Sequence, residues 1–296
     1  MAGLLKEGRP FALVTISGAD GGPRRSGAQM VVTQAEWWGF VSGGCVEADV
    51  AIQARAALSD GQPRQLVYGR GSPWIDTPLP CGGRLELLVE PIHPGDAAIE
   101  TFVAAYAQRR VVRYQTDGRA RRCGPPSQAE AGAWLVDHVF TPPQRLIVFG
   151  SDPIALAIAA LGASIGWASV IARAGGPDEP PGWGITYRSD PPATALHELA
   201  PDAQTAIAVA THDLHYDESA ILAALGSKAG YVGVLGARSR IPERVERLKR
   251  AGAAESDIAR LHMPIGLALG AATPWEIAVS VIAQIMAERQ NSASPR

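Results

Sequence analysis

The residues best suited to chemistry are two thiols flanked by glycines, in the stretches Ser42-Gly43-Gly44-Cys45 and Cys81-Gly82-Gly83. Residues 37–41 are largely apolar and predict a strand, and a helix is predicted over residues 45–58. Glycines between a strand and a helix let backbone N–H groups face a ligand, and the helix N-terminus favours an anion or a thiolate. A tight turn with a small buried cysteine would explain one such stretch, but two in one small domain predict a binding site.

Two adjacent arginines are a second candidate for ligand binding. Arg24 and Arg25 lie in a polar, glycine-rich loop over residues 17–27. Their guanidinium groups are forked donors that suit a phosphate group. The alternative, weighted equally, is that they are exposed loop charges without a ligand.

A damaged dinucleotide fingerprint follows the predicted strand over residues 145–149. The string Gly150-Ser151-Asp152-Pro153-Ile154-Ala155 stands in the place of G-x-G-x-x-G. Gly150 is the first glycine, but Asp152 replaces the second, and its carboxylate would repel a pyrophosphate and predicts a helix N-cap instead. The next strand ends at Ala172-Arg173, without the acid that holds a ribose. We therefore predict weak or absent binding of NAD, although an arginine there would tolerate the 2′-phosphate of NADP.

Polar residues also follow two later predicted strands. Thr211-His212-Asp213 follows residues 206–210, and Gly236-Ala237-Arg238-Ser239-Arg240 follows residues 231–235. Open α/β sheets bind ligands at the carboxyl ends of their strands, so Arg238 is a candidate for an anion site. His212 beside Asp213 is either an oriented base or a polar loop. As an acid–base pair they would serve an NADP-dependent oxidoreductase, which is the alternative function.

The elements that must position these residues form two predicted domains, at residues 1–143 and 144–296. The first is a mixed α+β domain with long loops. Its strands are predicted at residues 11–16, 29–33, 37–41, 64–68 and 84–90. The second alternates strands with helices, which is typical of a Rossmann-like, doubly wound parallel sheet, so the fold class is α/β. Its last helix is predicted from Thr273-Pro274-Trp275-Glu276, with a threonine cap and an early proline.

The composition excludes several functional classes. A net charge of −2 argues against nucleic-acid binding, and the apolar segments are too short or too interrupted to span a membrane. Three cysteines do not make a disulfide framework, and charges interrupt the first ten residues where a secretory signal would be apolar. We expect a reduced, cytoplasmic protein. Cys123 is expected to be exposed and uninvolved.

Several motifs, taken in order, resemble those of one family. They are Pro23-Arg24-Arg25-Ser26-Gly27-Ala28-Gln29-Met30, Val41-Ser42-Gly43-Gly44-Cys45-Val46-Glu47, Cys81-Gly82-Gly83, Thr211-His212-Asp213, Tyr231-Val232-Gly233-Val234-Leu235-Gly236, Leu261-His262-Met263-Pro264-Ile265-Gly266-Leu267 and Thr273-Pro274-Trp275-Glu276-Ile277-Ala278. Together they resemble the XdhC/CoxI family, the accessory proteins of xanthine dehydrogenase and related molybdenum hydroxylases. The resemblance covers nearly the whole chain except residues 93–143.

The resemblance implies a chaperone without turnover of its own, which binds molybdenum cofactor (a molybdopterin). It implies help with exchange of an oxo for a sulfido ligand by a cysteine desulfurase, and delivery to an apo molybdenum hydroxylase. Cys45 would then offer its thiolate to the metal, and Arg24, Arg25 or a glycine-rich helix start would hold the terminal phosphate. The cofactor is expected near Cys45 and a cleft between the domains. A structural adaptor without a ligand is a third hypothesis, and a homodimer is left open.

Overall fold

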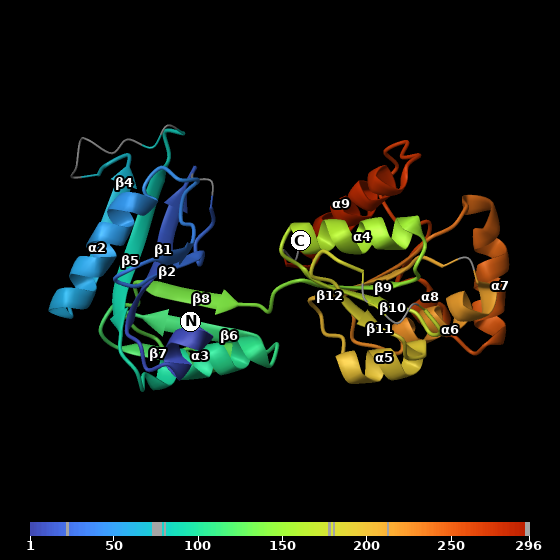
Figure 1. The fold of residues 1–296 in the computed structure, drawn as a ribbon, viewed down its shortest axis with the longest axis horizontal. Helices are drawn as coiled ribbons and strands as arrows, with labels where there is room; N and C mark the ends of the chain where they lie inside the picture. Colours follow the sequence, from blue (N-terminus) through green and yellow to red (C-terminus); the bar gives the residue numbers. More distant parts are fainter. Residues whose placement is uncertain are drawn as a thin grey trace. The chain divides into compact units, whose positions relative to one another are not determined.

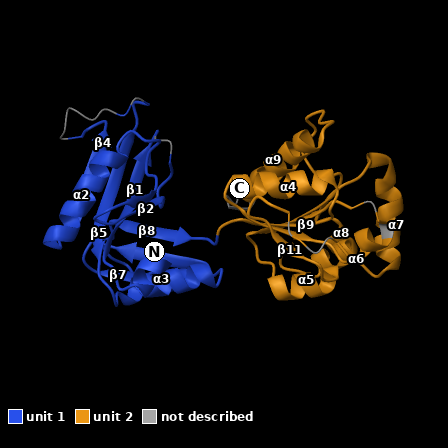
Figure 2. Ribbon diagram, viewed as in Figure 1, with its two compact units in different colours: residues 1–142 blue, residues 143–296 orange. Residues whose placement is uncertain are grey.

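The computed structural model describes residues 1–21, 24–72, 79, 81–176, 179, 181–211 and 213–293. The chain divides into two compact units, Met1–Pro142 and Pro143–Arg296 (Figure 2). Each has its own hydrophobic cores. Within the described part of the chain, no helix combines the length and the apolar character needed to cross a membrane.

The larger sheet of unit 1 has five strands in the order β3-β2-β1-β5-β4, with every neighbouring pair antiparallel (Figure 1). The strands are β1 (Phe11–Asp20), β2 (Gln29–Val32), β3 (Trp37–Gly39), β4 (Arg64–Gly69) and β5 (Arg84–Ile92). Side chains alternate between its faces, so Ala12 and Val14 contact helix α2 (Glu47–Asp60) while Phe11 and Leu13 belong to the opposite core. Both faces are therefore covered.

A second layer of unit 1 packs on the face away from α2. It contains helix α3 (Ala97–Ala107) and a three-stranded sheet in the order β7-β6-β8, formed by β6 (Val112–Thr116), β7 (Arg121–Gly124) and β8 (Val136–Phe140). The short segments are α1 (Ala2–Lys6) and η1 (Pro126–Gln128). The aromatic rings of Phe102, Tyr114 and Phe140 pack edge to face in the core between these elements. A turn at Asp117-Gly118 joins β6 to β7.

Unit 2 contains a parallel six-stranded sheet in the order β11-β10-β9-β12-β13-β14 (Figure 1). Its strands are β9 (Arg145–Phe149), β10 (Ala168–Ala172), β11 (Thr186–Arg188), β12 (Thr205–Val209), β13 (Tyr231–Val234) and β14 (Leu261–His262). Counted along this unit, the order is 3-2-1-4-5-6, which is the Rossmann order. The predicted fold class is confirmed.

Helices cover both faces of this parallel sheet. One face packs on α4 (Pro153–Ser164) and α9 (Pro274–Ala293). The other packs on α5 (Pro192–Leu199), α6 (Leu214–Leu225), α7 (Ile241–Arg250) and α8 (Glu255–Ile258), and η2 (Arg238–Arg240) precedes α7. The predicted start of α9 is confirmed, because Thr273 N donates to Glu276 at 2.9 Å and Glu276 N donates to the Thr273 hydroxyl at 3.3 Å.

Several boundaries in unit 1 differ from the sequence prediction. The first strand continues to Asp20, because β5 pairs with it as far as Asp20 opposite Arg84. Helix α2 begins at Glu47 instead of Cys45, and β3 ends at Gly39. The intervening residues form an irregular loop whose conformation depends on hydrogen bonds to one buried carboxylate.

Candidate functional site

The loop before α2, residues 40–46, carries Cys45 and is called the thiol loop. Ser42 and Glu47 organise it. The Glu47 carboxylate is 4% exposed and accepts hydrogen bonds from Val41 N at 3.1 Å, Ser42 N at 2.7 Å and the Ser42 hydroxyl at 2.6 Å. The same hydroxyl accepts from Cys45 N at 3.0 Å and Val46 N at 3.3 Å. Burial would raise the pKa of Glu47, but the hydrogen bonds from Ser42 and the backbone outweigh it and hold the pKa below its ordinary value.

This arrangement changes the part that the loop can play in ligand binding. The amides of Val41, Ser42, Cys45 and Val46 face the interior of the unit, not a ligand. The segment Gly43-Gly44-Cys45 is exposed, and a Cβ at either glycine would meet nothing within 4 Å. The Cys45 thiol is thus exposed to solvent on a loop whose backbone is held by buried hydrogen bonds to Ser42 and Glu47. It stands two positions ahead of α2, so the expectation of a thiol in the first helical turn is wrong.

The second glycine pair has a structural explanation. A Cβ at Gly83 would lie 2.9 Å from the carbonyl oxygen of Asp20, and Arg70 N donates to Gly83 O at 3.1 Å. Gly82 N donates to Leu79 O at 2.9 Å. Gly83 thus lets the start of β5 approach its neighbours closely, and Gly82 allows the turn before it by adopting φ +68°. Cys81 beside them is exposed.

The topology brings the candidate residues of unit 1 to one end of the larger sheet. Because neighbouring strands are antiparallel, β1, β3 and β4 end where β2 and β5 begin. The loops that carry Arg24 and Arg25, Cys45, and Cys81 all leave from that end. The hydroxyl of Tyr68 near the end of β4 donates to Asp49 in the first turn of α2 at 2.6 Å, which fixes the helix start against this sheet end.

At the carboxyl edge of the parallel sheet, the turn after β9 requires a glycine. Gly150 has φ +141°, and a Cβ there would overlap the carbonyl oxygen of Ala210 at the end of β12. Asp152 caps α4, since its carboxylate accepts from Ala155 N at 2.8 Å. The predicted N-cap is confirmed, and the amide that a pyrophosphate would use is already bonded.

The end of β10, where a dinucleotide would place its ribose, is occupied by Tyr216 of α6. The Tyr216 hydroxyl donates to Ala172 O at 3.0 Å and accepts from Ala174 N at 3.3 Å. Asp213 caps the same helix by accepting from His215 N at 3.0 Å and Tyr216 N at 3.1 Å. These backbone hydrogen bonds hold the pKa of Asp213 below its ordinary value, as expected for a capping carboxylate. The order of strands is that of a nucleotide-binding fold. At the carboxyl edge, however, the side chains of Asp152 and Tyr216 bond to the backbone groups that a dinucleotide would approach.

The chain resembles known proteins over nearly its whole length. Residues 146–285 match the model of the XdhC Rossmann domain, and residues 4–69 match that of the XdhC and CoxI family. The molybdenum cofactor insertion chaperone PaoD of Escherichia coli K12 is 31% identical over 291 residues, which cover 96% of this chain and 85% of PaoD. The chain belongs to the XdhC and CoxI family.

Two other relatives of this XdhC and CoxI family member are matched over less than half of their own length. The chain is 26% identical to YqeB of Escherichia coli K12 over 98% of its own length and 46% of that protein. It is 30% identical to a Bacillus subtilis protein named as a probable xanthine dehydrogenase subunit, over 51% of its own length and 45% of that protein. A crystal structure from Bacillus halodurans, described as a xanthine dehydrogenase, has the same fold with a TM-score of 0.74. That likeness covers 99% of this chain and 97% of the other, at 22% identity.

The remaining predicted residues of this family member are distributed as follows. Arg24 and Arg25 are exposed, and Arg238 is exposed in the short helix η2. His212 lies outside the described residues. Among the residues that the structure describes, no three His, Cys, Asp or Glu side chains are grouped to hold a metal ion.

Cys123 is not the exposed residue that the sequence suggested. It lies half-buried on β7 against the core of unit 1, and burial raises the pKa of its thiol to about 11. Its neighbour Arg122 points to the opposite face of the strand, and Arg121 is itself mostly buried in ion pairs with Glu90 and Asp96, so charged sequence neighbours do not make Cys123 exposed.

The sequence analysis did not identify three residues that have structural roles in this XdhC and CoxI family member. Glu47 organises the thiol loop, Tyr68 fixes the helix start and Tyr216 covers the end of β10. Only Glu47 left a signal, because it is the first charged residue after the uncharged run of residues 37–46.

Proposed function

We propose that this protein binds molybdenum cofactor and delivers it to a molybdenum hydroxylase of the xanthine dehydrogenase type, without turnover of its own. The observation that carries the proposal is the similarity to PaoD, which is named as a molybdenum cofactor insertion chaperone and aligns over 96% of this chain. The similarity to the Bacillus subtilis protein, named as a probable part of a xanthine dehydrogenase, supports the class of target.

The thiol loop of unit 1 suits a cargo that must be bound and then released. Cys45 is exposed, and its loop is fixed by Ser42 and Glu47, so little conformational entropy is lost when the thiol binds. A soft metal centre accepts a thiolate ligand. Because the described residues offer no larger metal-binding group, Cys45 would add one ligand to a metal that arrives with its others.

Three further groups at this sheet end extend the proposed site. Cys81 is a second exposed thiol, and Arg24 and Arg25 are exposed forked donors for the terminal phosphate of the cofactor. In unit 2, Gly150, Asp213, Arg238 and His212 are proposed contacts at the carboxyl edge of the parallel sheet.

Two protein partners complete the proposal. A cysteine desulfurase would supply the sulfur when an oxo ligand of the bound cofactor is replaced by a sulfido ligand. A homodimer is proposed as the assembly in solution. Its candidate surface is the edge strand β3, which exposes Trp37 and Trp38 and, among the described strands, pairs only with β2.

Transfer of cofactor to an apo-enzyme tests the proposed function. A cofactor-free molybdenum hydroxylase is mixed with limiting cofactor, with and without the full chain, and its activity is followed under anaerobic conditions. The proposal predicts faster and more complete activation with the chain present, and no such effect from an equal amount of Cys45→Ala. Equal activation with and without the chain would contradict it.

A further inference from the structure

Three turns of unit 1 that are distant in sequence meet in one pocket. It is lined by Gly61, Gln62 and Pro63 after α2, by Pro91 near the end of β5 and His93 just after it, and by Gly118, Arg119 and Arg121 from the β6–β7 hairpin. The pocket has a volume of about 230 Å³. Gly118 has φ +95°, and a Cβ there would lie 3.1 Å from Pro63, so the hairpin packs tightly on the turn after α2.

Every polar side chain that lines this pocket can donate a hydrogen bond; these are Gln62, His93, Arg119 and Arg121. Arg119 forms no ion pair with a described residue, and its Nη2 donates to Gln62 Oε1 at 3.3 Å, which leaves the Gln62 amide nitrogen for a ligand. The His93 imidazole is exposed beside them. No described aspartate or glutamate lines the pocket. A lining of this kind selects a ligand that accepts hydrogen bonds.

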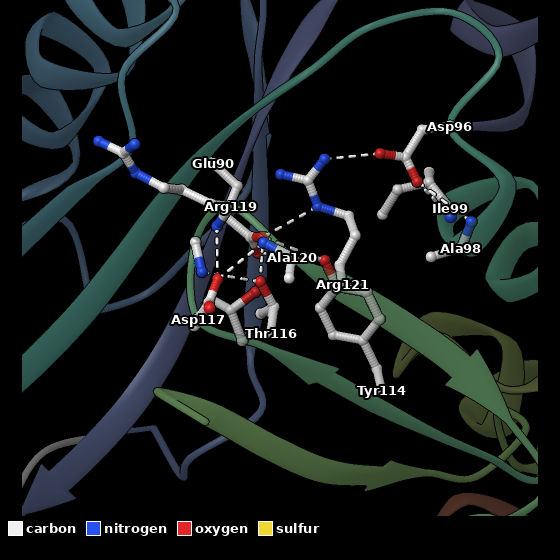
Figure 3. Close-up of polar contacts among 12 residues, drawn as sticks. Glu90, Asp96, Ala98, Ile99, Tyr114, Thr116, Asp117, Arg119, Ala120 and Arg121 are labelled. Atoms are coloured by element: carbon white, nitrogen blue, oxygen red, sulfur yellow. Dashed lines mark hydrogen bonds and ion pairs between the residues drawn. The ribbon is translucent and has the colours of Figure 1, made fainter. Parts of the chain in front are cut away.

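Contacts within the protein hold the Arg121 side chain in place before any ligand binds. Its side chain is 14% exposed, with Nε bonded to Glu90 at 3.2 Å and Nη1 to Asp96 at 2.6 Å (Figure 3). Those contacts leave Nη2 without a described partner. Figure 3 shows the side chains of Arg119 and Arg121 coming from the same hairpin. A guanidinium that is already immobilised loses little entropy on binding a ligand.

Three nearby carboxylates reduce the positive field but have other donors. Glu90 accepts from Tyr114, Thr116 and Arg121, and Asp96 accepts from the first amides of α3. Asp117 accepts from the amides of Arg119 and Ala120 in its own turn. Binding is therefore expected to depend on directed hydrogen bonds more than on net charge, and to be weak, on the order of millimolar.

We propose that this pocket binds a phosphate group, as the free anion or as a small phosphate monoester. Donors arrive from three separate turns, which suits a tetrahedral oxyanion better than a planar carboxylate. The volume is below the roughly 300 Å³ at which sites for whole small molecules begin, so a complete pterin cofactor is too large. The site goes beyond the proposed chaperone function.

The pocket is also remote from the exposed thiols. Strand β5 runs from Arg84, beside Cys81, to Ile92, beside His93. At about 3.3 Å per residue the two ends are on the order of 25 Å apart. A ligand at this pocket therefore does not contact the thiol site.

Titration of the full chain with inorganic phosphate, followed by amide NMR at constant ionic strength, tests the site. Sodium chloride and acetate are the reference anions, and glycerol 3-phosphate is the monoester. We expect saturable shifts at Gly61, Gly118 and Arg119 with phosphate. Saturation by inorganic phosphate alone would identify the free anion, and saturation by both would include monoesters; either result supports the site.

Two exposed substitutions make the test specific. Arg119→Gln and His93→Ala should each weaken phosphate binding at least several-fold, with little change in the melting temperature. Arg122→Gln is the matched control, because Arg122 lies on the same hairpin, forms an ion pair with Glu130 and does not line the pocket. The proposal is overturned if chloride gives the same shifts, if acetate binds as tightly as phosphate, or if Arg119→Gln binds phosphate as the parent does.

Discussion

The Ser42 hydroxyl donates a 2.6 Å hydrogen bond to the buried carboxylate of Glu47, and the same hydroxyl accepts from the amide of Cys45 at 3.0 Å. An exposed thiol is thus connected to the interior of its unit through one serine. The charge of Glu47 is balanced by hydrogen bonds, with no cation contacting it among the described ion pairs. Carboxylates held in this way are sensitive to loss of any one donor.

Replacing Glu47 should loosen the thiol loop. Glu47→Gln keeps the shape but exchanges one acceptor oxygen for an NH₂ donor facing other donors, so we expect a loss of about 1–3 kcal/mol in the free energy of unfolding. Because the folded-state pKa of Glu47 is lowered, its stabilising contribution is present above its ordinary value of 4.5 and is lost as the pH falls through the folded pKa. Urea denaturation between pH 3 and 7 measures the difference. Glu36→Gln, at an exposed position, is the control, and an equal effect of both changes would contradict the role of Glu47.

The three thiols should differ in their rate of alkylation. Cys45 and Cys81 are exposed, whereas Cys123 is half-buried with a pKa of about 11. At pH 8 roughly one Cys123 in a thousand is a thiolate, so iodoacetamide should modify Cys45 and Cys81 well before it. Mass spectrometry of peptides over time gives the order. Modification of Cys123 together with the other two would show that its environment is open.

NAD and NADH should bind weakly or not at all. The Asp152 carboxylate occupies the first amide of the expected phosphate site, and Tyr216 covers the end of β10. A repulsion and the lost ribose contacts should reduce the affinity by about two decades or more compared with micromolar binders. Calorimetric titration of the parent measures this, with Asp152→Asn as the variant that removes the charge and keeps a side-chain oxygen to cap α4. A micromolar dissociation constant for the parent would contradict the assignment.

The Glu90 cluster gives a pH dependence of the opposite sign to that of Glu47. Burial raises the pKa of Glu90, and the hydrogen bonds from Thr116 and Arg121 offset this only in part (Figure 3). A raised folded-state pKa means that the contribution to stability is present below the ordinary value of 4.5 and is lost as the pH rises through the folded pKa. The parent should therefore lose stability relative to Glu90→Gln as the pH rises from about 4 toward neutrality. A constant difference across that range would contradict the raised pKa.

The sequence was sufficient to predict those helices and strands whose local residue pattern matches the way they pack in the folded protein. Parallel strands such as β9, with bounds predicted correctly at residues 145–149, are mostly apolar runs before helices, and the caps at Asp152 and Thr273 are local signals. The loop before α2 was not predictable in detail. Its conformation depends on one carboxylate that contacts residues five and six positions earlier, and a helix propensity beginning at Cys45 does not include that contact.

The sequence predicted which residues belong to the candidate site, but it did not predict how they are placed relative to one another in space. That Cys45 and Cys81 leave from the same sheet end follows from the strand order, which no local pattern specifies. The half-buried position of Cys123 and the part of Tyr216 likewise depend on packing between distant segments. The glycines beside Cys81 had a structural use that the sequence did not separate from ligand binding.

The content of molybdenum and pterin in purified protein tests the central proposal most directly. The full chain is produced in molybdenum-replete cells, purified without oxygen and denatured, and the fluorescent oxidised pterin and the metal are counted per chain. We predict about one of each in the parent, the greatest loss in Cys45→Ala, a smaller loss in Cys81→Ala and none in Cys123→Ala, with melting temperatures nearly unchanged. A parent without pterin, or a Cys45→Ala variant that retains as much as the parent, would contradict a cofactor held at the Cys45 thiol.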